Sequence, residues 1–191
     1  MQRVLSLTLW PTGDSCIVSK PKEQRSIFEC ISELVGSSDA SEAWELRVDG
    51  ASRGNPGHSG AGVYLKKGTQ DVVKKGFYLG TRTNNEAEYL ALVVGVYFLK
   101  KEIQKGERVT IISDSQLLIC QLNGSYRVRK PELQLLHATV RGELEGIACT
   151  FKHVERALNS VADALANQGV DEKITLPLKV LDVLKRYEIY L

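Results

Sequence analysis

The sequence of 191 residues has only four cysteines, and no two of them form a Cys-x-x-Cys pair. Zinc sites need clustered cysteine or histidine, and disulfide-rich secreted folds need densely spaced cysteines, so neither organises this chain. Each cysteine lies in an apolar context, which is typical of reduced structural thiols; the four are Cys16, Cys30, Cys120 and Cys149. We therefore expect a cytoplasmic protein.

The chain also lacks a long hydrophobic run and a recognisable export signal. Its longest apolar stretch, residues 90–99, is interrupted by a glycine and is too short to cross a bilayer, which takes about 20 residues. The first residues, MQRVLSLTLWPTGD, have neither an adequate hydrophobic region nor a small-residue cleavage site. We expect no contact with a membrane and no signal peptide.

No excess of charge of one sign marks the chain, because its formal net charge is only +2. The distribution is more informative than the sum. Residues 1–43 hold four Lys or Arg against six Asp or Glu, so residues 44–191 carry the basic excess. A modestly basic domain is compatible with a polyanionic substrate but does not identify one.

A small polar stretch, GSSDASEA at residues 36–43, reads as a linker and divides the chain in two. Before it, residues 3–10 alternate as a strand does, and residues 22–36 have apolar residues at helical spacing. Residues 1–43 are thus predicted to form a small βα or ββα appendage with its linker. This appendage is expected to be structural or to contact another protein.

Residues 44–191 are predicted to form one α/β domain, a mixed sheet with helices on both faces. Turn signals and alternating apolar residues predict an antiparallel meander, which is followed by helices and β-branched strands in alternation. The predicted strands span residues 44–52, 60–68, 71–80, 109–114 and 149–156. The predicted helices span residues 84–103, 115–124, 131–146, 158–170 (capped near Asn159 and stopped at Gly169) and 178–189.

Four acids occupy positions that folding alone does not favour, within or beside apolar strands and helices: Asp49, Glu88, Asp114 and Asp163. A single such acid is commonly a capping or surface residue. Strand ends and helix starts of a mixed sheet converge on one edge, however, where four carboxylates would repel one another unless cations neutralise them. Oxygen ligands without His or Cys suit Mg²⁺ or Mn²⁺, and two such ions about 3.5–4 Å apart serve in-line phosphoryl displacement.

The segments DGASRGNPG, TNNEAEY, SDSQLL and HVERALNSVADALA resemble the four motif blocks of the type 1 ribonuclease H family. They occur in the family's order and with compatible spacing, over about residues 44–170. The resemblance implies a ribonuclease H-like fold with a mixed five-stranded sheet, in which three strands form the antiparallel meander and two are parallel. It also implies an endoribonuclease that hydrolyses the RNA strand of RNA–DNA hybrids, largely independently of sequence, and leaves 5′-phosphate and 3′-hydroxyl ends.

The resemblance assigns a role to each acid. Asp49 would bridge two Mg²⁺ ions, for which Mn²⁺ can substitute. Glu88 and Asp114 would complete one metal site, and Asp163 would hold the ion that carries the attacking water. Glu88 fits this role better than Glu86, which is expected to face solvent, because Glu88 shares the inward face of its helix with the apolar residues one and two turns further on.

His153 lies ten residues before Asp163 and matches a histidine that assists proton transfer or product departure in many members of the family. Its ordinary pKa of about 6.5 suits that task at neutral pH. The alternative is a histidine at a sheet edge with only a structural role.

Seven residues match substrate-binding positions of the family: Gly50, Ser52, Asn55, Thr83, Asn84, Asn85 and Gln116. Ser52 and Asn55 would reach the minor-groove edge and the 2′-hydroxyl of the RNA strand, and Gln116 would touch a base or ribose near the cut. Thr83 and Asn84, at a helix start, would hold a DNA phosphate, although both residue types also cap helices. The glycines after Asp49 are expected to let the duplex approach the backbone closely.

The chain departs from the family in having little sequence between Asp114 and Asp163, with no room for the basic protrusion of some bacterial members. It therefore resembles the compact archaeal and plant-type branch. A short basic segment, Arg127 to Lys130, is either a small substrate contact or a solvated turn. Three alternative functions stay open: cleavage of double-stranded RNA, cleavage of RNA–DNA junctions, and nucleic-acid binding without catalysis.

Overall fold

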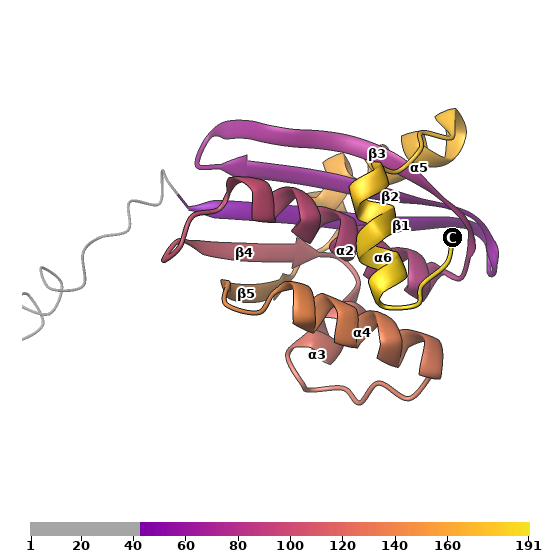
Figure 1. Cartoon of the computed structure of the whole chain (residues 1–191). Coiled ribbons are helices and arrows are strands. Elements are labelled where there is room, and N and C mark those ends of the chain that lie inside the picture. The colour runs from indigo at the N-terminus through magenta and orange to yellow at the C-terminus, as the bar shows by residue number, and fades with distance from the viewer. Residues whose placement is uncertain (1–42) are drawn as a thin grey trace, which may run out of the picture. The chain divides into compact units, whose positions relative to one another are not determined.

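A computed structural model describes residues 43–191 of the chain. The elements predicted before residue 43, together with Cys16 and Cys30, lie outside the described residues, so the division into an appendage and a domain stays a prediction. The described residues contain a five-stranded sheet in the order β3-β2-β1-β4-β5 (Figure 1). Its strands are β1 (Trp44–Gly54), β2 (Gly57–Lys67), β3 (Gln70–Arg82), β4 (Arg108–Ser113) and β5 (Ala148–His153).

The pairing of the strands confirms the predicted mixed sheet. β1, β2 and β3 form the antiparallel meander, whereas β4 pairs in parallel with both β1 and β5. The helices are α2 (Asn84–Glu102), α3 (Gln116–Leu122), α4 (Pro131–Glu143), the 3₁₀ turn η1 (Arg156–Asn159), α5 (Ser160–Glu172) and α6 (Leu178–Arg186).

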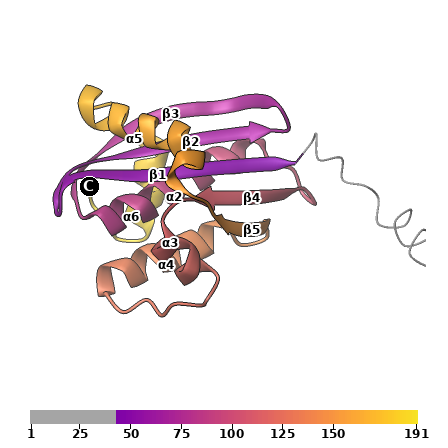
Figure 2. The same cartoon turned by 180° about the vertical axis from the view of Figure 1, so that it is seen from behind.

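Helices cover both faces of the sheet, as predicted. α2 packs against β1 and β2 and contacts α4, while α5 packs against β1, β2 and β3 from the opposite face (Figures 1 and 2). The core is built from the apolar side chains of the strands and α2, including the fully buried Leu46, Val48 and Leu92. Only a loop at residues 123–130 joins α3 to α4, which confirms that the basic protrusion is absent.

Two further expectations from composition can be compared with the described residues. Cys120 and Cys149 are both free, as expected for reduced thiols. Between residues 43 and 191, no helix is both long enough and apolar enough to span a membrane. The cytoplasmic location stays a prediction.

The start of α2 explains why Glu86 is not one of the convergent acids. The Thr83 hydroxyl accepts a hydrogen bond from the Glu86 N–H, and the Glu86 carboxylate accepts one from the Thr83 N–H at 2.8 Å, which forms a capping box. Glu86 is thus half-buried and engaged in capping, and the expectation that it faces solvent is wrong.

The prediction for the glycines after Asp49 is wrong for three of them, because protein and not duplex fills the space beside them. A side chain at Gly60 or Gly62 would lie about 2 Å from a carbonyl oxygen of α5 (2.2 Å from Ala166, 1.9 Å from Ala162). A side chain at Gly50 would collide with the backbone of α2, 2.2 Å from the Glu88 nitrogen. These glycines allow helices to approach the sheet closely on both faces.

The ends of two C-terminal elements also differ from the prediction. The strand expected to reach residue 156 ends at His153, because the chain turns into η1 and is held there by hydrogen bonds to β1. The helix expected to stop at Gly169 continues to Glu172 and ends with Lys173 in the left-handed conformation (φ 50°). Gly169 lies against the Phe77 backbone, so it is a packing residue and not a helix stop.

The register of the sheet creates an opening at one end. The β1–β4 ladder stops at the pair Arg47 and Ile112, whereas β4 and β5 stay paired as far as Ser113 and His153. β1 continues for seven more residues beside β2 alone. Asp49 therefore lies on a part of β1 that β4 no longer flanks, next to the point where the chain leaves β4.

Two glycines in helices provide a test of the close packing of helices against the sheet. Adding a Cβ to Gly169 would place it 2.5 Å from the Phe77 backbone N and O, which cannot move independently of the sheet. We expect Gly169→Ala to lower the free energy of unfolding by about 1–3 kcal/mol in urea denaturation, in spite of the better helix propensity of alanine.

Gly142→Ala in α4 is the matched control. Its Cβ would meet only the Tyr187 hydroxyl, at 2.6 Å, and that side-chain end can swing away. We expect no loss of stability, since alanine favours a helix over glycine by about 1 kcal/mol. Equal destabilisation by both substitutions would contradict the packing role of Gly169.

Candidate active site

A polar cavity of about 400 Å³ lies at the opening between β1 and β4 and brings all four predicted acids together. Asp49 comes from β1, Glu88 from α2, Asp114 from the end of β4 and Asp163 from α5. The remaining lining residues are Gly50, Ala51, Ser52, Asn84, Ser115, Arg156 and Asn167. The local fold thus gathers carboxylates from four separate elements.

Two of these acids are buried in spite of their charge. Asp49 is 5% exposed and Glu88 is 6% exposed. Burial, followed by the negative charges of Asp114 and Asp163, raises the pKa of Asp49 to about 7. Burial also raises the pKa of Glu88 well above its usual range, and the neighbouring Asp49 and Asp114 add to the effect, while the Gly50 N–H partly opposes it.

The other two acids are held by polar side chains. The Arg156 guanidinium donates a hydrogen bond to the Asp163 carboxylate at 2.5 Å, an interaction that raises the pKa of Arg156. The Asn159 amide donates to the Asp114 Oδ1 at 2.7 Å. Asn167, one turn further along α5, donates to the backbone oxygen of Asp163 at 2.9 Å.

The residues present fit a hard divalent cation. Within residues 43–191, no three His, Cys, Asp or Glu side chains already form a ligand cluster, and Asp163 pairs with Arg156 instead. The donor set is nevertheless made of carboxylate oxygens alone, which suits Mg²⁺ or Mn²⁺. The Glu88 Oε2 is buried without a hydrogen-bond partner, as expected of an oxygen whose natural partner is a cation.

His153 lies beside the site but does not line the cavity. It is the last residue of β5, its side chain is exposed, and its Nε2 lies 3.1 Å from the backbone oxygen of Asp114. This position next to the Asp114 backbone is compatible with proton transfer at the rim of the site. Its role stays a prediction.

Five of the seven predicted substrate residues fall into two groups, whereas Gln116 and Asn55 line neither cavity. Gly50, Ser52 and Asn84 line the cavity with the acids. Thr83 and Asn85 line a neighbouring cavity of about 500 Å³, whose other wall includes Pro56 and the start of α4. Gln116 is exposed at the start of α3 and lines neither cavity.

Asn55 has a structural contact that the sequence did not reveal. Its Oδ1 accepts a hydrogen bond from the Asn84 backbone N–H at 3.1 Å, which joins the tip of the β1–β2 hairpin to the start of α2. The Ser52 hydroxyl bonds to the backbone oxygens of Gly54 and Arg82, at 2.6 and 2.8 Å. The hairpin is thus fixed beside the acids before any ligand binds.

Sequence reasoning missed the site roles of Arg156, Asn159 and Asn167. Asn159 is the residue before α5, as predicted, but its side chain makes no capping hydrogen bond and reaches Asp114 and the Val48 oxygen instead. All three residues lie in or just after the block HVERALNSVADALA, so their spacing from Asp163 was the available signal.

The raised pKa of Asp49 predicts how the metal-free protein responds to pH. The folded state keeps the Asp49 proton up to about pH 7, whereas the unfolded chain releases it near its usual value of 3.8. Between these values the folded state binds more protons, so the free energy of unfolding falls as the pH rises. In EDTA at pH 8, we expect Asp49→Asn to raise it by on the order of 2 kcal/mol.

The same substitution is expected to have a much smaller effect near pH 4, where the carboxyl is protonated in the folded state and still partly protonated in the unfolded chain. Urea denaturation at both pH values measures the difference, with Glu145→Gln at an exposed position of the chain as the control. A stabilisation by Asp49→Asn that does not depend on pH would show that buried charge is not its cause.

Residues 47–169 match the family model described as "Reverse transcriptase-like". Ribonuclease HI of Halobacterium salinarum is 39% identical over 127 residues, which are 65% of this chain and 62% of that protein. A bifunctional protein of Mycobacterium tuberculosis is 31% identical over 134 residues, which are 66% of this chain but only 35% of that protein. The chain thus spans less than two thirds of the length of either relative.

Solved structures agree with these matches. The crystal structure of the Halobacterium salinarum RNase H1 has a TM-score of 0.65 at 36% identity and covers 68% of this chain and 98% of that one. LC11-RNase H1, crystallised in complex with an RNA/DNA hybrid, has a TM-score of 0.63 at 30% identity, over 68% of this chain and 97% of that one. The chain therefore belongs to the reverse transcriptase-like family and, within it, to the type 1 ribonuclease H proteins with their mixed five-stranded α/β fold.

Proposed function

We propose that this chain is an endoribonuclease that hydrolyses the RNA strand of RNA–DNA hybrids and leaves 5′-phosphate and 3′-hydroxyl ends. The observation that carries the proposal is the convergence of four carboxylates from four elements in one polar cavity. A related protein about 30% identical to the chain was crystallised with an RNA/DNA hybrid, which supports the same substrate class.

The four acids would hold two divalent cations, with Asp49 between them, Glu88 and Asp114 on one side and Asp163 on the other. When bound, the cations supply activation of water and stabilisation of the leaving oxygen in an in-line displacement. Asp163 would have to exchange its contact with Arg156 for the cation. Arg156, which is largely exposed, would then be free to bind a phosphate oxygen of the substrate.

The groups that face the substrate support recognition of sugar and backbone rather than of base sequence. Ser52 lines the cavity, and Asn55 lies at the tip of the same hairpin, where both are proposed to contact the 2′-hydroxyl side of the RNA strand. The Thr83 hydroxyl is already engaged with Glu86 in the capping box. We therefore assign the phosphate contact at the start of α2 to Asn84 and Asn85.

A cleavage assay with labelled substrates tests the proposal. With Mg²⁺, and separately with Mn²⁺, we expect cleavage of an RNA–DNA hybrid and none of double-stranded DNA, because a DNA duplex lacks the 2′-hydroxyl. Products of hybrid cleavage should carry 5′-phosphates when analysed by gel and phosphatase treatment. Cleavage of double-stranded RNA or of RNA–DNA junctions in preference to hybrid would assign the site to a different substrate, and cleavage of DNA would reject the proposal.

Asp114→Asn tests the role of the acids in this reaction. The amide keeps the size of the side chain but removes the charge, so we expect turnover to fall by more than the roughly 100-fold that is typical of residues around a metal ligand. Binding of the hybrid, measured by fluorescence anisotropy, should stay close to wild type. Glu145→Gln is the exposed control, and near-normal turnover by Asp114→Asn would rule out the proposed cation site.

A further inference from the structure

We propose that Asn159 is a positioning residue, which fixes the Asp114 carboxylate and the adjoining part of strand β1 for cation binding. This inference rests on the proposed function, since it concerns how the same acids are held. Asn159 is 1% exposed, it lies on the turn η1 between β5 and α5, and its amide touches two elements of the site at once.

The two hydrogen bonds of this amide lie where the sheet opens. β1 loses its β4 partner after Arg47, and the next carbonyl, that of Val48, accepts a hydrogen bond from the Asn159 Nδ2 at 3.0 Å. The same Nδ2 donates to the Asp114 Oδ1 at 2.7 Å. The Asn159 side chain thus connects β1 to the end of β4 where the two strands are no longer paired. One of its two hydrogen bonds is made to Asp114, a proposed catalytic acid.

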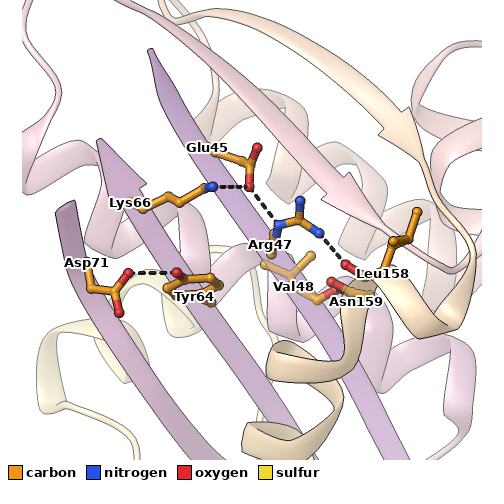
Figure 3. A network of polar contacts seen from close by, with 8 residues as sticks. All are labelled: Glu45, Arg47, Val48, Tyr64, Lys66, Asp71, Leu158 and Asn159. Atoms are coloured by element: carbon orange, nitrogen blue, oxygen red, sulfur yellow. Dashed lines mark hydrogen bonds and ion pairs between the residues drawn. The ribbon is translucent and has the colours of Figure 1, made fainter. Parts of the chain in front are cut away.

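A second contact pins the same turn to the same strand. The Arg47 guanidinium donates to the backbone oxygen of Leu158, while Glu45 accepts from Arg47 at 2.6 Å and pairs with Lys66 at 3.1 Å (Figure 3). Two consecutive residues of β1 are therefore bonded to two consecutive residues of the turn. This arrangement prevents η1 from moving along β1 without breaking both bonds.

The unsatisfied Oδ1 of Asn159 indicates that the orientation of the amide group serves the site. Its Oδ1 is buried without a protein partner, and an unsatisfied buried acceptor costs stability. The amide does not cap α5, although it lies at the capping position. The orientation observed is the one that directs the NH₂ group toward Asp114 and the Val48 oxygen.

The consequence extends to three of the four acids. Asp114 is held directly, Asp49 follows the restrained Val48, and Asp163 begins the next turn after Asn159, four residues along the chain. Glu88, which comes from α2 on the other face, is the acid that Asn159 does not restrain. Loss of the amide should therefore weaken cation binding without changing the hybrid-binding surface around Ser52 and Asn84.

The experiment measures Mg²⁺ binding to the metal-free full chain by NMR titration, with no nucleic acid present. We expect Asn159→Leu, which keeps the branched shape of the side chain but removes the donor, to weaken Mg²⁺ binding by about 10–100-fold. In the cleavage assay, kcat at a fixed sub-saturating Mg²⁺ concentration should fall while KM for the hybrid stays unchanged. Tyr64→Phe is the matched control, because it removes a hydrogen bond to Asp71 on the same sheet face and none of the hydrogen bonds to the turn (Figure 3).

A double-mutant cycle separates positioning from a merely structural role. If Asn159 acts through Asp114, the effect of Asn159→Leu on Mg²⁺ affinity should be much smaller in an Asp114→Asn background, where only the bond to the Val48 oxygen still contributes. Wild-type Mg²⁺ affinity in Asn159→Leu, or a full additional loss in the Asp114→Asn background, would overturn the inference. Failure of the wild type to cut hybrid would reject the proposed function alone, because the Mg²⁺ titration still reports on Asn159.

A second variant covers the case in which Asn159→Leu does not fold, as judged by circular dichroism. Arg47→Met leaves Asn159 intact and removes the contact to the turn, together with the ion pair to Glu45. We expect weaker Mg²⁺ binding than in the wild type, by a smaller factor than for Asn159→Leu. Wild-type affinity in folded Arg47→Met would count against the clamped turn.

Discussion

The separation of β1 from β4 is the constraint on which the site depends. Two strands that are hydrogen-bonded to each other leave no gap between them for side chains from other elements. Because the ladder ends at Arg47 and Ile112, β1 runs on with one edge uncovered, and groups from both faces of the sheet can meet around that edge. Glu88 arrives from the α2 face and Asp163 from the α5 face, which no intact five-stranded ladder would allow.

This convergence carries an electrostatic cost that shapes the chemistry. Asp49 and Glu88 are buried near other acids, so the charged form of each is disfavoured until a positive charge arrives. Arg156 and Asn159 satisfy the two more accessible acids, whereas an oxygen of Glu88 is left without a partner. A folded protein with such buried, closely spaced acids gains stability from any cation that binds the folded form but not the unfolded one. Cation binding and folding should therefore be coupled at this site.

The sequence alone predicted the acids, the order of the elements and the mixed sheet, because these depend on local patterns and on motif spacing. Asp114, for example, follows a β-branched strand, and such strand ends meet at one edge of a sheet. The role of Asn159 could not be predicted in this way. A residue before a helix reads as a cap, and only the three-dimensional register shows that Val48 lacks a β4 partner. The prediction for the glycines failed for the same reason, since α5, which touches Gly60 and Gly62, lies about 100 residues further along the chain.

The two halves of the site differ in how they are held, and this difference bears on catalysis. The proposed substrate side is fixed by the capping box at Thr83, within one helical turn, and by the bond between Asn55 and the start of α2, which spans 29 residues. The cation side depends on contacts between distant elements, which cross from β1 to η1 and from η1 to Asp114. Since a displacement of about 1 Å at reacting groups is costly, the long-range contacts are the ones that limit the accuracy of the site. If the proposed function is right, residues that do not touch the substrate, such as Arg47 and Asn159, contribute to the accuracy of the reaction.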